Sequence, residues 1–183
     1  MTTYGEVGIN VGGIGRWTRF VLGIVVLILV ATDFYPSTHA HAASFYWLFV
    51  VSFLVIIATY TSIHVLIGDK LIGKNPLWAT LIFVVPTMFL LIAPMVSPAL
   101  SIGNWIDYPV LNHPFELALL LYIGASFFAQ WRDKYGGCEV VSIPNLFFRK
   151  NYGSYCVPLL PLDLAEKFIT DKAEKLQNSK QLN

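Results

Sequence analysis

Three histidines are the residues whose type and spacing most clearly suggest chemistry. His39 and His41 are separated by one alanine, and His113 lies much further along the chain. Imidazole suits copper and zinc, and a His-x-His spacing brings two rings within reach of one ion. Histidines in polar loops are, however, more often solvated or packed against a neighbour. We therefore predict no cofactor, and we keep a copper or zinc site of His39, His41 and His113 as the alternative.

His113 has a second interpretation, as part of a helix start. It belongs to the run Asn112-His113-Pro114-Phe115-Glu116. Asn112 or His113 could cap the helix, Pro114 suits the first turn, and Glu116 falls where a capping box needs an acid. We expect this to be the main role of these residues.

The remaining reactive side chains give little support to an enzyme. Cys138 and Cys156 are too far apart for a Cys-x-x-Cys motif, and no histidine follows His113 to serve as their base. His64 has no acid near it in its own apolar segment, which favours a packed interfacial histidine over a proton relay. A redox or sulfur enzyme stays a hypothesis, and we expect a chain that is not an enzyme.

The elements that must position these residues are long apolar segments. Hydrophobic residues make up 56% of the 183 residues and charged residues 13%, against about 25% charged in soluble domains. This composition excludes a water-soluble enzyme, a disordered protein and a nucleic-acid binder. Four segments, at about residues 17–35, 45–67, 77–97 and 114–131, could each cross a lipid bilayer. They predict an all-α membrane protein, an up-down bundle of four transmembrane helices within residues 1–131.

The twelve basic residues are distributed unevenly between these segments. Arg16 and Arg19 precede the first segment, Lys70 and Lys74 separate the second from the third, and the other eight follow the fourth. The loops at 32–44 and 97–113 have none. The positive-inside rule then predicts a multi-pass protein with both termini in the cytoplasm. It also places His39, His41 and His113 on the outer side.

The last part of the chain, residues 132–183, is predicted to be a cytoplasmic tail. Leu162, Ala165 and Phe168 recur at helical spacing, and Pro161 suits a first turn. An amphipathic helix is therefore expected at about residues 162–177. It would lie either on the lipid surface or against a partner subunit.

The N-terminal segment supports a resemblance. Residues 10–23 read NVGGIGRWTRFVLG, an Asn-x-Gly start followed by a basic pair and an apolar helix with an early glycine. Over about residues 8–32 this resembles a small uncharacterised prokaryotic inner-membrane family, some members of which form the membrane half of a membrane-bound rhodanese. The resemblance implies the plasma (inner) membrane of a prokaryote. The chain departs from it in having four apolar segments rather than two and no rhodanese loop around Cys138, so sulfurtransferase activity is not implied.

Since no catalytic constellation is found, the sequence favours a non-catalytic accessory or structural subunit of a larger membrane-bound enzyme complex. Its partners would be other membrane subunits and the lipid bilayer, with no nucleic acid. A copper membrane monooxygenase, such as ammonia or methane monooxygenase, is the first candidate host, because the outer-side histidines lie where copper is handled; a respiratory or photosynthetic complex follows closely. The alternatives are a metal-handling membrane protein and a small-molecule transporter or channel.

Overall fold

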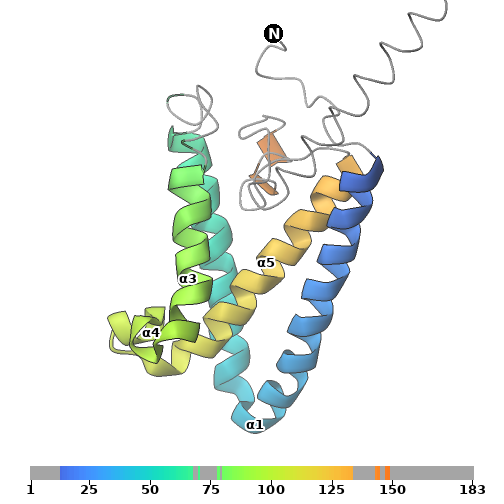
Figure 1. Ribbon diagram of the computed structural model, residues 1–183. Coiled ribbons are helices and arrows are strands. Elements are labelled where there is room, and N and C mark those ends of the chain that lie inside the picture. The colour runs from blue at the N-terminus through green and yellow to red at the C-terminus, as the bar shows by residue number, and fades with distance from the viewer. Residues whose placement is uncertain are drawn as a thin grey trace, which may run out of the picture.

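The computed structural model describes residues 13–67, 70, 78, 80–133, 143–144 and 147–148, with the side chains of all of these except 35–42, 80 and 133. Every regular element within this part of the chain is a helix (Figure 1). The elements are α1 (Gly13–Ile67), the π-helix η2 (Thr80–Val84), α3 (Val85–Val96), the 3-10 helix η3 (Pro98–Leu100), α4 (Ile102–Trp105), the 3-10 helix η4 (Pro109–Leu111) and α5 (Asn112–Asp133). The prediction of an all-helical fold is confirmed for the described residues.

Three helical stretches are long and apolar enough to cross a membrane, which supports the predicted membrane protein. They are Gly13–Phe34, Ala43–Ile67 and Pro109–Arg132. The predicted span at 77–97 corresponds to a shorter apolar helix, Leu81–Val96. At 1.5 Å per residue, the 5-residue η2 and the 12-residue α3 together reach about 25 Å, which is less than the ~30 Å of a hydrocarbon core.

Helix α1 carries the first two of these stretches without an intervening loop. Its helical backbone continues through residues 32–44, where a loop was expected. Figure 1 shows α1 bending back on itself at its midpoint, so that Gly13–Phe34 forms a first limb and Ala43–Ile67 a second limb. Pro36 lies in this segment and lacks the N–H that a straight helix needs, which accounts for a bend. The alanines that follow it favour helix and account for the missing loop.

Helix α5 is the central element, because it packs against both limbs of α1. Within the most apolar 18 residues of each limb, 22% of the residues are buried. Within the corresponding 18 residues of the α5 stretch, 56% are buried. The α5 residues Leu119 and Tyr122 are almost completely buried. The Tyr122 ring stacks on that of Tyr60 in the second limb, with ring centroids 5.2 Å apart. The apolar core therefore lies around α5, with α1 outside it.

Two glycines allow the first limb of α1 to approach α5 closely. A Cβ atom on Gly124 would lie 3.2 Å from side-chain carbons of Val26 and Leu27. A Cβ atom on Gly23 would lie 3.1 Å from the ring of Phe128. Small residues at such crossings let helices meet through van der Waals contact, which is the main attraction between helices in lipid.

The start of α3 is irregular. Pro86 lies in its first turn and cannot donate a backbone hydrogen bond, and the π-helix η2 precedes it directly. The Thr87 hydroxyl donates to the carbonyl oxygen of Phe83 at 2.5 Å. The Tyr60 hydroxyl lies 2.6 Å from the same threonine oxygen. This buried contact joins α3 to the second limb of α1.

Candidate functional site

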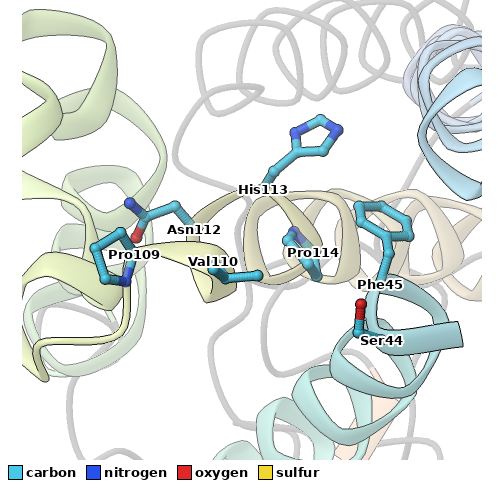
Figure 2. Close-up of a pocket in the computed structure, with 7 residues that line it drawn as sticks. All are labelled: Ser44, Phe45, Pro109, Val110, Asn112, His113 and Pro114. Carbon is cyan, nitrogen blue, oxygen red and sulfur yellow. The ribbon is translucent and has the colours of Figure 1, made fainter. Parts of the chain in front are cut away.

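A hollow of about 350 Å³ lies where the second limb of α1, η4 and α5 meet. It is at the end of the molecule that holds the α1 bend, α4 and the start of α5, which we call the His113 end (Figure 1). Figure 2 shows residues of α1 facing those of η4 and α5 across it. The lining residues are Ser44, Phe45, Pro109, Val110, Asn112, His113 and Pro114.

The side chain of Asn112 fixes the wall of the hollow that comes from the α3–α5 connection. Its Oδ1 accepts a hydrogen bond from the Gly103 backbone N–H at 2.6 Å, and its Nδ2 donates to Asn104 Oδ1 at 3.3 Å. Asn104 in turn donates to the carbonyl oxygen of Pro98. Asn112 was predicted as a possible cap of its own helix. The structure instead uses its amide to hold α4 against the start of α5.

A tight turn completes this connection. Asp107 adopts a φ of 55°, in the left-handed region. The backbone N–H of Tyr108 then donates to the carbonyl oxygen of Gly103 at 2.6 Å. A Cβ atom on Gly103 would lie 2.5 Å from the Tyr108 oxygen, so this position requires glycine.

His113 is the one predicted site residue whose side chain the structure describes. Its Nε2 lies 3.6 Å from Asp33 Oδ2, at the end of the first limb. Its ring centroid lies 5.5 Å from that of Phe45. Glu116, one turn further along α5, interacts electrostatically with both His113 and Asp33. Asp33 and Glu116 are therefore the acidic neighbours of this imidazole.

The structure describes one side chain of the predicted metal site, that of His113. The backbone of His39 and His41 belongs to α1, in the segment that joins its limbs, while their side chains lie outside the description. Among the side chains that are described, no group of three or more His, Cys, Asp or Glu could hold a metal ion. Cys138, Cys156 and the predicted helix at 162–177 also lie outside the described residues.

A buried arginine at the opposite end, the Arg19 end, was not foreseen. The sequence shows Arg19 only as a basic flank, yet its side chain is 0% exposed. Its Nε donates to Gln130 Oε1 at 2.7 Å and an NH1 group to the Gly15 carbonyl at 3.1 Å. Gln130 is the feature of the sequence that could have indicated this burial, because an amide in an apolar segment needs a polar partner.

Arg16 provides a second link between α1 and α5 at this end. Its Nε donates to the carbonyl oxygen of Trp131 at 2.9 Å, and its guanidinium carbon lies 5.5 Å from the centre of the Trp131 ring. His64, at the same end of the second limb, is 2% exposed and stacks on Phe148 with ring centroids 5.4 Å apart. The side chains of Arg16, Arg19 and Gln130 at this end join α1 to α5.

The comparisons with known proteins add no relative. The resemblance of residues 8–32 to a prokaryotic inner-membrane family therefore stays a prediction, since no protein-family model, no curated protein and no solved structure matches this chain.

Proposed function

We propose that this chain is a non-catalytic accessory subunit of a larger membrane-bound enzyme complex. The observation that carries the proposal is the use of the polar side chains inside the described helices. Arg19 bonds to Gln130, and Tyr60 contacts Thr87. Each pair joins one helix to another, and none of these groups lines the hollow at the His113 end. These buried polar groups therefore support a role in joining helices.

The proposal includes four crossings in an up-down bundle, with both termini in the cytoplasm of a prokaryote and the chain in its plasma membrane. The distribution of the basic residues supports this orientation. Helix α3 would be the third crossing. Its apolar stretch is short, but an exposed Trp78 precedes it and suits the lipid headgroup layer. The tail would then lie beside the basic Arg19 end.

The first limb of α1 offers an apolar surface to neighbouring subunits or to lipid. Ile14, Trp17, Val21, Ile24 and Ile28 are all exposed and recur at spacings of three and four residues, on one helix face. As the first candidate host we propose a copper membrane monooxygenase of the ammonia or methane type, and as the second a respiratory or photosynthetic complex. The basis for this order is the predicted position of His39, His41 and His113 on the outer side, where copper is handled.

Purification in mild detergent tests the proposal directly. An affinity-tagged full-length chain is expected to bring down a fixed set of larger membrane subunits in constant stoichiometry. A tagged unrelated membrane protein at the same expression level is the control for non-specific capture. Recovery of the chain only as a monomer or homo-oligomer would overturn the subunit proposal. Oxidation of ammonia or methane by the recovered complex would distinguish the first host from the second.

A metal-handling protein is the second candidate function. The supporting observation is that Asp33 and His113 meet beside the α1 segment that carries His39 and His41. Replacing both His39 and His41 with alanine is expected to reduce the bound copper or zinc measured by elemental analysis. A His64→Ala variant is the control, because His64 lies at the other end of the second limb. Unchanged metal content in the double variant would rule this function out.

A further inference from the structure

We propose that Phe147 and Lys70 form a binding site for anionic phospholipid at the Arg19 end of the molecule. Phe147 inserts into the boundary between acyl chains and headgroups, and the Lys70 ammonium group pairs with a lipid phosphate. The site requires only that the chain lies in a membrane. It is therefore independent of the proposed subunit role, of the orientation and of the number of crossings.

The depth of the site follows from the contacts of the residues around Phe147. Ile143 packs against the apolar core around α5, and Pro144 is almost completely buried. Phe148 stacks on His64 of the second limb, and Figure 1 shows these pieces of chain, in orange, at the level of the helix ends. His64 lies three residues before the end of the apolar stretch Ala43–Ile67, which is about 5 Å along a helix. Phe147 therefore lies close to the depth at which a membrane helix ends.

Phe147 presents a large apolar surface at this depth. Its side chain is 75% exposed, although the next residue, Phe148, is held against His64. Leu66, which is close to His64 on the second limb, is exposed as well. In a bilayer, side chains at this depth meet the boundary between headgroups and acyl chains, where phenylalanine and leucine are typical of buried protein surfaces. Lipid would therefore remove the exposed Phe147 ring from water.

Lys70 supplies the positive charge. Its backbone N–H donates to the carbonyl oxygen of Ile67 at 3.1 Å, which places Lys70 directly after the last turn of the second limb, and it is exposed. The sequence beside both parts of the site is basic, since residues 68–74 and 149–150 together contain four basic residues and one acid. Basic residues beside a membrane surface attract anionic lipid. The charge of this region therefore complements an anionic headgroup.

A partner protein is the competing occupant of this surface. Lipid is favoured because the apolar and the basic group lie at the depth where a bilayer presents acyl chains and phosphates together. Phe147 and Lys70 would each meet the matching part of one phospholipid molecule. A protein would need an apolar and an acidic group at the same spacing.

Fluorescence quenching in vesicles tests the position of Phe147. In a full-length chain with Cys138 and Cys156 replaced by serine, Phe147→Cys is labelled with a fluorescent NBD group and reconstituted with phosphatidylcholine and phosphatidylglycerol. Nitroxides near the top of the acyl chains are expected to quench this label more than deep nitroxides or aqueous iodide. Val55→Cys is the control, because Val55 is exposed at the middle of the stretch Ala43–Ile67 and should be quenched most by deep nitroxides.

Two outcomes for the label at position 147 would overturn the proposal. Strong quenching by iodide alone would place Phe147 in water. Protection from iodide and from both nitroxides would show that protein covers it. Failure of the lipid nitroxides to quench the Val55 control would instead contradict the membrane location of the chain, so the two failures are distinguishable.

The choice of lipid is tested with the same shallow nitroxide carried by phosphatidylglycerol or by phosphatidylcholine. The phosphatidylglycerol form is expected to bind beside position 147 at least fivefold more tightly. Lys70→Gln is expected to lower this preference by about fivefold, since one basic residue near an anionic surface has about that effect. Lys70→Arg is the matched control, because it keeps the charge, and it is expected to keep the preference. Equal binding of the two lipids, or the same preference in Lys70→Gln as in Lys70→Arg, would overturn the assignment.

Discussion

At the scale of single residues, the contact between Arg19 and Gln130 has the largest electrostatic consequence. A guanidinium that is removed from water is stable only when acceptors replace its hydration, and here a side-chain amide and a backbone carbonyl do so. The energetics of such a pair are asymmetric. Loss of one partner leaves the other polar group buried without its hydrogen bond. Replacement of both partners by apolar groups leaves no buried polar group that needs one.

This asymmetry predicts the relative stabilities of the single variants Gln130→Leu and Arg19→Met and of their double variant. Gln130→Leu is expected to lower the free energy of unfolding in detergent by about 1–3 kcal/mol, because the buried Arg19 loses an acceptor. The double variant Arg19→Met, Gln130→Leu is expected to be more stable than Gln130→Leu alone. Thermal unfolding followed by circular dichroism provides the measurement. A double variant less stable than both single variants would show that the pair is not the source of the effect.

At the scale of elements, the apolar segments were predictable and their connections were not. The predicted span at 114–131 lies within α5, at Asn112–Asp133, because a long and predominantly apolar segment has few alternatives to a helix. The backbone through residues 32–44 was expected to be a loop, because Asp33 and Pro36 are typical of turns. The structure continues the helix around a bend there. Local cues therefore identified the position of the reversal but not its conformation.

The contacts between elements could largely not be predicted from the sequence, because each contact depends on which helices lie side by side. The burial of Arg19 depends on which helix lies beside the first limb, and no single segment contains that information. The same holds for the contact of His113 with Asp33, which come from different helices. His113 itself was identified from its residue type. The amide of Asn112 was noticed, but its partner Gly103 follows only from the turn at Asp107.

The close approach of α1 and α5 predicts a size limit at Gly124. Gly124→Leu is expected to lower stability by about 1–3 kcal/mol, because a larger side chain must displace Val26 and Leu27. Gly13→Ala is the control, since nothing lies within 4 Å of a Cβ atom at that position. It is expected to leave the unfolding temperature unchanged. Equal unfolding temperatures for the two variants would contradict the packing described at this crossing.

At the scale of the whole molecule, the two ends differ in charge. The described residues at the Arg19 end include Arg16, Arg19 and Arg132, while Asp33, Asp107 and Glu116 lie toward the His113 end. Basic residues are retained on the cytoplasmic side of a membrane during insertion. The difference in charge between the two ends therefore supports the proposed orientation. Labelling of each end can test it.

Thiol labelling is expected to distinguish the two ends. In a background with Cys138 and Cys156 replaced by serine, an Ile106→Cys variant is expected to react with a membrane-impermeant maleimide in intact cells. An Ile14→Cys variant is expected to react only after permeabilisation. The two native side chains are similarly exposed, at 59% and 62%. The reverse pattern would contradict the orientation, and labelling of both in intact cells would contradict an odd number of crossings between them.

The unbroken helical backbone of α1 also has a consequence for how the chain is made. Between Phe20 and Ile67 the sequence contains one Asp, Glu, Lys or Arg, which is Asp33. During synthesis, two limbs joined by a helical bend present themselves to the insertion machinery as one hairpin. In the proposed topology, translocation of a single carboxylate close to the bend would place two apolar stretches in the bilayer in one step. Helix α1 would thus be in position before α5, which packs against both of its limbs, leaves the ribosome.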